Sequence, residues 1–269
     1  MSTLLLVHAH PDDEAIATGG AMMMARDAGH RVVLVTATRG EVGEISNMDE
    51  ATSRPRLAEI RTEELRRAGQ ILGVSRQVFL DYRDSGMAGT GDNDNPASFH
   101  RAPLAEAAER LAEVLRAERP EVVVTYDPTG TYFHPDHIKS HQVTTAALDL
   151  LRPEGWEPAK FYWHAFPRSG LEALDRRMKE AGRPNPFENM PAGMGVPDDQ
   201  ITTRVRCGEY VQRKREAFQA HLSQNSPDSF FLNTPDELFT EAFGTENYVL
   251  ARGRLGAPRP EPNLFAGIE

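Results

Sequence analysis

Short apolar runs alternate along the first part of the chain with longer stretches in which apolar residues recur at helical spacing. The runs that fit buried strands of a parallel sheet are residues 3–7, 31–36, 77–80, 121–126 and 160–165. The stretches that fit helices are residues 14–28, 56–72, 104–115 and 135–151. This alternation predicts an α/β fold, a mostly parallel sheet with helices on both faces.

Long stretches without either pattern interrupt this alternation at residues 39–55, 81–103 and 182–199. Irregular loops of this length are uncommon in compact domains and are usually functional. Because open α/β sheets bind ligands at the carboxyl ends of their strands, we expect the loops to lie over that edge. The proline-rich tail from Gly256 fits either a packed arm or a loose end.

Two clusters of histidine and aspartate follow two of the predicted strands. The first strand runs into His8-Ala9-His10-Pro11-Asp12-Asp13-Glu14, and the fourth is followed by Tyr132-Phe133-His134-Pro135-Asp136-His137. A single histidine or aspartate at a strand end is more often a cap or a structural hydrogen-bonding group. Two such clusters at one sheet edge, however, contain the two imidazoles and one carboxylate typical of a catalytic zinc site.

Charge and cysteine content exclude several other kinds of protein. The 269 residues carry a formal net charge of −10, which disfavours nucleic acid as a partner because phosphate binding depends on clustered lysine and arginine. Cys207 is the only cysteine, so neither a disulfide framework nor a cysteine-rich metal site is available. The apolar run at residues 4–7 is too short for a membrane span or signal peptide, and we expect a cytoplasmic protein.

The two clusters resemble the motifs of a known family. His10-Pro11-Asp12-Asp13-Glu14 and His134-Pro135-Asp136-His137 are similar to the two signature motifs of the LmbE-like, or PIG-L, de-N-acetylases, in the same order and after the corresponding strands. The resemblance implies a Rossmann-like fold and a zinc enzyme that hydrolyses a linear amide C–N bond, removing acetyl from an N-acetylglucosamine-containing small molecule. It implies one domain over residues 1–269, with the metal-binding core in 1–165 and substrate-pocket and carboxyl-terminal elements in 166–269.

The motifs also imply roles for particular residues. His10, Asp13 and His137 match the zinc ligands, and Asp12 matches the general base that takes a proton from the attacking water. The two aspartates have separate tasks, because a carboxylate bound to a metal is a poor proton acceptor.

His134 matches an electrostatic partner or general acid near the scissile amide, and Asp136 a group that orients His134 or a ligand. Tyr132 matches a tyrosine that helps to polarise the carbonyl and would donate a hydrogen bond to the oxyanion.

Candidate substrate contacts lie in the loops and on the second helix. By resemblance, Arg61 contacts the polar substrate and Asp84 a sugar hydroxyl, and Glu41 is a further candidate. A guanidinium suits sugar hydroxyls, although Arg61 could instead pair with a carboxylate on a solvated helix face. Glu41 could equally lie in a surface turn.

Other histidines and one glutamate have mainly structural interpretations. His141 is four residues after His137, so it is a rival ligand, but a half-buried position inside the helix is favoured. His8 is expected to be structural, Glu14 to cap the first helix or support a ligand, and His221 to be a core histidine that could still approach the site.

Other functions fit the same residues less well. Two histidines and one aspartate also describe a non-haem Fe(II) oxygenase, but those sites are typically set in β-barrels. A nucleotide-binding module needs a glycine-rich turn after the first strand, where this chain has carboxylates that would repel a pyrophosphate. An amidase acting on a thiol conjugate with the same machinery is a nearer alternative. The metal could be Fe2+ instead of Zn2+, and a homo-oligomer is compatible with the sequence.

Overall fold

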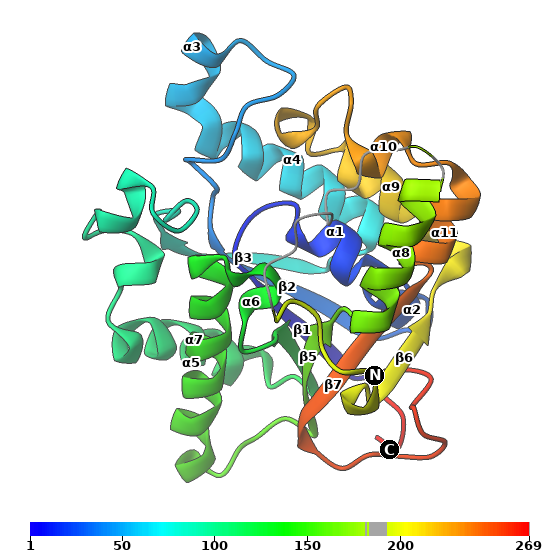
Figure 1. Cartoon of the computed structure of the whole chain (residues 1–269). Helices are drawn as coiled ribbons and strands as arrows, with labels where there is room; N and C mark the ends of the chain where they lie inside the picture. The colour runs from blue at the N-terminus through cyan, green and yellow to red at the C-terminus, as the bar shows by residue number, and fades with distance from the viewer. Residues whose placement is uncertain (181, 183–192, 269) are drawn as a thin grey trace.

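The chain forms one sheet with helices on both of its faces (Figure 1). The computed structural model describes residues 1–180, 182 and 193–268. The strands are β1 (Thr3–His8), β2 (Arg31–Thr38), β3 (Arg76–Tyr82), β4 (Val122–Tyr126), β5 (Lys160–Ala165), β6 (Thr203–Arg206) and β7 (Thr245–Gly253). The helices are α1 (Asp13–Ala17), α2 (Gly19–Asp27), α3 (Glu50–Ser53), α4 (Leu57–Leu72), α5 (Leu104–Glu118), α6 (Gly130–Phe133), α7 (Pro135–Leu151), α8 (Arg168–Glu180), α9 (Val211–Gln219), α10 (Phe230–Asn233) and α11 (Asp236–Phe243).

The strand order places the two histidine–aspartate motifs side by side. The order is β3-β2-β1-β4-β5-β7-β6, and the pairs from β3 to β5 are parallel. β1 and β4 are direct neighbours, with Leu4 opposite Val122 and Leu6 opposite Val124. The loops that follow these two strands therefore leave the sheet at the same edge, and the predicted α/β class is confirmed.

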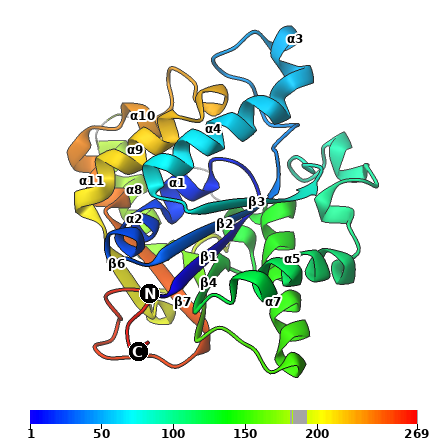
Figure 2. The same ribbon diagram turned by 180° about the vertical axis from the view of Figure 1, so that it is seen from behind.

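Alternating side chains of the central strands supply two separate cores. Leu5 and Val7 of β1 face a layer of residues from α5 and α7, whereas Leu4 and Leu6 face α2 and α4. Figures 1 and 2 show these helix pairs on opposite sides of the sheet. Continuous apolar runs in the strands are explained by this double coverage, since both faces of a parallel sheet are buried.

The single helix predicted over residues 14–28 is wrong in one respect, because it is broken into α1 and α2 at Thr18. The cause lies far along the chain. The carboxylate of Glu246, in β7, accepts hydrogen bonds from the backbone N–H groups of Gly20 (2.7 Å) and Ala21 (2.9 Å) and so caps α2. The buried ammonium of Lys214 balances its charge at 2.7 Å.

Two further strands, β6 and β7, extend the sheet beyond the five that were predicted. β7 pairs antiparallel with both β5 and β6. The tail that follows is a packed arm: Glu261 is fully buried, where its carboxylate accepts hydrogen bonds from Lys160 Nζ (2.5 Å) and Tyr162 Oη (2.6 Å).

Two sequence expectations concern the chain as a whole. Within the described residues, no helix combines the length and apolar character needed to cross a lipid bilayer. Most of the loop predicted at 182–199 lies outside the described residues, which resume at Gly193.

Candidate metal centre and active site

The turn between β1 and α1 holds the first motif in a strained backbone. Asp12 has φ 116°, a left-handed conformation that is rare outside glycine and that clusters at functional sites. The turn is fixed by Glu14, whose carboxylate accepts the Asp12 N–H at 2.9 Å, and by Asp13, whose carboxylate accepts the His10 N–H at 2.8 Å. Glu14 therefore serves the turn, and its other oxygen lies 2.7 Å from Nε2 of the buried His221.

The second motif opens α7. His134 is the N-cap residue, and its Nδ1 accepts the N–H of Asp136 at 3.1 Å, while Pro135 occupies the first helical turn. The preceding loop folds back so tightly that a Cβ on Gly130 would lie 2.7 Å from the backbone nitrogen of Ile138. Gly130 has φ 63°, and this approach lets its carbonyl lie 3.2 Å from Nδ1 of His137.

The three predicted metal ligands come together. Asp13 Oδ1 lies 3.3 Å from His137 Nε2, and Asp13 Oδ2 lies 3.5 Å from His10 Nδ1. One ring nitrogen each of His10, His134 and His137 lies within 4.8 Å of the others, so His134 belongs to the same cluster. All four side chains are largely shielded from solvent.

The hydrogen bond of the His137 ring leaves its other nitrogen available to bind a cation. Because a carbonyl can only accept, His137 Nδ1 donates to Gly130 O, and in the neutral ring this leaves a lone pair on Nε2. That buried Nε2 has no hydrogen-bond partner among the described residues and faces a carboxylate oxygen. Two lone pairs in this arrangement need a proton or a metal ion between them, and nitrogen and oxygen donors suit zinc or iron(II).

Asp136 supports His10. Its Oδ2 lies 3.2 Å from His10 Nε2, and the backbone N–H of Ser85 donates to the same oxygen at 2.9 Å. Asp136 was predicted to orient either His134 or a metal ligand. Its carboxylate contacts the predicted ligand His10, and its backbone N–H donates to His134. Such a carboxylate–histidine contact is typical of metal sites, because it fixes the ring and the tautomer of the ligand.

Charges around the cluster shift its pKa values. Burial opposes protonation of His10, but Asp84, Asp13 and Asp136 outweigh it and raise the pKa of His10 well above 6.5. Burial also opposes ionisation of Asp13, yet His137 and His10 hold the pKa of Asp13 well below its usual value. Burial, reinforced by the neighbouring His10 and His137, lowers the pKa of His134 to about 3. His134 is therefore neutral at physiological pH.

Asp12 stands apart from this cluster and pairs with Arg61. Arg61 Nη2 donates to Asp12 Oδ2 at 3.0 Å, and Nη1 donates to Gly40 O at 2.9 Å. Burial raises the pKa of Asp12 to about 6, while the Arg61 charge works in the opposite direction. Gly40 is necessary for this arrangement, because a Cβ there would lie 2.0 Å from Nη1.

The three predicted substrate contacts are less exposed than expected. Arg61 and Asp84 each expose only 3% of their surface, so the alternative of Arg61 on a solvated helix face is wrong. Asp84 Oδ1 lies 3.4 Å from His10 Nε2, and its backbone N–H donates to Glu41 Oε2 at 3.2 Å. Glu41 lies in a turn and is half-buried, which agrees with the alternative of a turn residue.

Tyr132 lies on the open side of the cluster, with 39% of its surface exposed and its ring 4.9 Å from that of His137. The rival ligand His141 is not part of the cluster: it is half-buried, and its Nδ1 lies 3.0 Å from Tyr126 O. His8 is fully buried behind the motif, as expected of a structural residue.

Sequence reasoning missed Tyr126, at the end of β4. Its hydroxyl donates to Asp13 Oδ2 at 2.6 Å from a position that is 1% exposed. The sequence feature that could have identified it is a tyrosine at the carboxyl end of a buried strand, shortly before the second motif.

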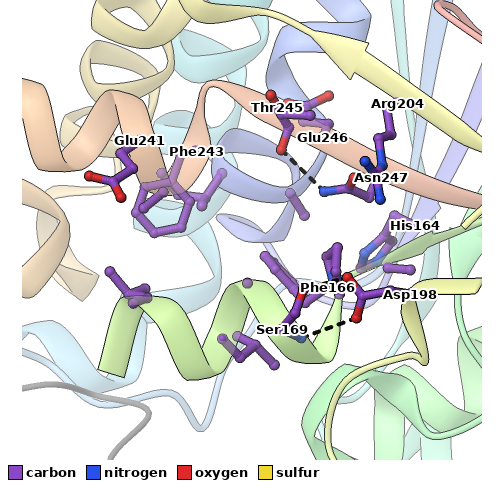
Figure 3. A pocket seen from close by; sticks show the side chains of 18 of the residues that line it. His164, Phe166, Ser169, Asp198, Arg204, Glu241, Phe243, Thr245, Glu246 and Asn247 are labelled. Atoms are coloured by element: carbon purple, nitrogen blue, oxygen red, sulfur yellow. Dashed lines mark hydrogen bonds between the residues drawn. The ribbon is translucent and has the colours of Figure 1, made fainter. Parts of the chain in front are cut away.

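A separate cavity of about 280 Å³ lies beside this centre, between α8, α11 and β7 (Figure 3). Phe166, Phe243 and Asn247 contribute to its wall, and Ser169 donates a hydrogen bond to Asp198 at its rim. None of the predicted metal ligands, nor Asp12, is among the described residues that line it. The predicted metal ligands and Asp12 therefore lie at the ends of β1 and β4 and not in this cavity.

Fold and site together define a class of protein: a Rossmann-like α/β domain with histidines and carboxylates gathered where two adjacent parallel strands end. The family model described as GlcNAc-PI de-N-acetylase, PIG-L, matches residues 5–148, and the chain belongs to this family.

Relatives and solved structures add detail. The chain is 41% identical over 282 residues to a 1D-myo-inositol 2-acetamido-2-deoxy-alpha-D-glucopyranoside deacetylase of Salinispora arenicola, covering 98% of this chain and 91% of that protein. Its fold is similar to that of N,N'-diacetylchitobiose deacetylase from Pyrococcus horikoshii (TM-score 0.64, 21% identity, 93% of this chain and 83% of that chain). It is also similar to GalB, a 4-carboxy-2-hydroxymuconate hydratase of Pseudomonas putida (TM-score 0.58, 19% identity, 96% and 99%). Because a hydratase shares the fold, the fold alone does not specify the reaction.

Proposed function

We propose that this protein is a zinc-dependent N-deacetylase that hydrolyses the acetamide of a small N-acetylglucosaminyl compound. The observation that carries the proposal is the buried His137 Nε2, which has no hydrogen-bond partner among the described residues and faces Asp13 Oδ1 at 3.3 Å, next to His10. The relatives' names support the reaction and the substrate class. A cytoplasmic location is part of the same proposal and is consistent with a single, buried cysteine.

His10, Asp13 and His137 would hold the metal. When bound, a divalent cation supplies Lewis acidity toward the attacking water and the amide carbonyl. We assign His134 to a different task, because its Nδ1 already accepts the Asp136 N–H. The neutral ring then carries its proton on Nε2 and presents a single N–H donor.

Asp12 is the general base in this proposal. It is next to the predicted ligand Asp13 in sequence, but its carboxylate pairs with Arg61 and not with the predicted ligands. A carboxylate that does not bind the metal can accept a proton from water. His134 Nε2–H and the Tyr132 hydroxyl are the donors that stabilise the developing oxyanion. The remaining N–H of neutral His134 can donate a hydrogen bond but is too weakly acidic to protonate an amine at neutral pH, so we assign delivery of the proton to the leaving amine to Asp12.

A panel of N-acetyl compounds tests the proposal. The zinc-loaded protein should release acetate from the inositol glycoside of N-acetylglucosamine faster than from diacetylchitobiose or free N-acetylglucosamine. A thiol conjugate with an internal amide tests the amidase alternative, and oxygen uptake tests the oxygenase. If fully loaded protein released no acetate from any N-acetyl sugar, the proposed function would be wrong.

Arg61 gives this proposal a pH signature. The base must be ionised, so kcat/KM should fall as pH drops through the pKa of Asp12. Removing the positive charge in Arg61→Met should raise that pKa by about one unit or more, because a neighbouring arginine lowers an aspartate pKa by ~1–3 units. The acid limb of the profile should therefore move to higher pH, with zinc content unchanged.

Arg66→Met is the matched control, because Arg66 lies on the same helix and pairs with Glu63 on its exposed surface. It should leave the profile unchanged. A rise in KM without movement of the acid limb in Arg61→Met would instead support the sequence prediction that Arg61 contacts substrate directly.

A further inference from the structure

Tyr126 connects the two motifs beneath the candidate metal centre. Its hydroxyl donates to Asp13 Oδ2 at 2.6 Å and accepts the backbone N–H of Ala9 at 2.9 Å. Its ring stacks on that of His137, with centroids 4.2 Å apart and planes inclined by 23°. One buried side chain therefore touches two of the three predicted ligands, each by a different kind of contact.

The direction of the hydroxyl follows from its partners. An ionised carboxylate can only accept, so the single phenol proton points to Asp13. His8 Nδ1 lies 3.3 Å from the same oxygen, and its Nε2 lies 2.9 Å from Thr18 Oγ1. Thr18 Oγ1 donates to the backbone carbonyl of Glu14 at 3.3 Å, so His8 and Thr18 pack the phenol against the turn that carries Asp13.

The two carboxylate oxygens of Asp13 therefore have different contacts. Oδ2 accepts two hydrogen bonds, from Tyr126 Oη and from the backbone N–H of His10. Oδ1 instead faces the lone pair of His137 Nε2 at 3.3 Å. Without the phenol, Oδ2 would keep only the backbone donor, and the carboxylate could turn both oxygens toward a cation.

We propose that Tyr126 is a positioning residue that reserves Asp13 Oδ1 for the metal and keeps Oδ2 out of the coordination sphere. The inference rests on the proposed metal site and adds a residue that neither motif contains. A one-oxygen carboxylate leaves room at the ion for water and substrate, whereas a two-oxygen carboxylate would occupy part of that room.

Tyr126→Phe tests the inference, because it removes only the hydroxyl. Tyr162→Phe is the matched control: Tyr162 is equally buried, lies on the neighbouring strand β5, and donates to the carboxylate of Glu261 at 2.6 Å, away from the predicted ligands. Zinc affinity is measured on metal-free protein by competition with a chromophoric chelator. The coordination of the ion is followed by the visible absorption of the cobalt(II)-substituted protein.

Zinc should bind Tyr126→Phe about 10- to 100-fold more weakly than wild type, as expected when a group supporting a ligand is removed. Its cobalt(II) bands should weaken as the coordination number rises, while Tyr162→Phe should match wild type in both measurements. Melting temperatures of the two metal-free variants should fall by similar amounts, which separates positioning from a general loss of stability.

Equal zinc affinity and equal cobalt(II) spectra in Tyr126→Phe and Tyr162→Phe would overturn the inference while leaving the proposed function intact. A wild-type protein that binds no zinc would overturn both. If Tyr126→Phe does not fold, the cobalt(II) spectrum of the wild-type protein decides the question, because one Asp13 oxygen, two histidines and a water give a four-coordinate ion with strong visible bands. Weak wild-type bands, typical of a higher coordination number, would count against the inference.

Discussion

Replacing Asp12 with alanine is expected to lower kcat by about 10²- to 10⁴-fold, the usual contribution of a general base, while zinc content stays at the wild-type level. The reason is the division between adjacent carboxylates: Asp13 lies against His10 and His137, whereas Asp12 pairs with Arg61. Zinc by elemental analysis and acetate release, measured on the same sample, check both halves of the expectation.

Asp12→Asn serves as the matched variant, since it keeps the shape of the side chain and removes only its basicity. Both substitutions should lose activity to a similar degree. Wild-type turnover in either variant at full zinc occupancy would refute the assignment of Asp12 as the base.

The second large effect is expected at the ligands themselves. Asp13→Ala and His137→Ala should reduce bound zinc to background and abolish acetate release, a greater loss than the ~10- to 100-fold produced by removing a supporting group. His141→Ala is the control, because His141 lies on the same helix but hydrogen-bonds to Tyr126 O, outside the cluster. Stoichiometric zinc in His137→Ala, or loss of zinc in His141→Ala, would show that the ion is held by other residues.

The sequence was sufficient to predict the parallel half of the fold because those strands are buried on both faces. Residues 3–7 and 121–126 are continuous apolar runs, and they became β1 and β4 with little change of boundary. β6 and β7 lack this signal. β7 is only partly buried and mixes polar with apolar residues, so its pattern does not stand out from a loop.

The break at Thr18 illustrates a different limit. Gly19 and Gly20 weaken a helix at this point, but the carboxylate that caps α2 belongs to Glu246, 226 residues from Gly20. The glycines permit the break, but the position at which α2 begins depends on this distant side chain and therefore on tertiary packing.

The site shows the same division between local and distant causes. The two motifs placed His10, Asp13 and His137 at neighbouring strand ends, and the structure brings them together. Which carboxylate supports which histidine was not predictable, because Asp136 meets His10 across the junction of two loops. The burial of Arg61 beneath the first motif depends equally on how α4 packs against that turn.

The arm that follows β7 supplies a charge that the sheet needs in order to fold. Lys160 lies within the sheet, on β5, and among the described residues its buried ammonium pairs with the carboxylate of Glu261, 101 residues later. A buried charge without a partner is strongly unfavourable. During synthesis, the buried Lys160–Glu261 pair therefore cannot form until Glu261 has left the ribosome, so the sheet around β5 reaches its native packing later than β1 to β4, which precede it along the chain.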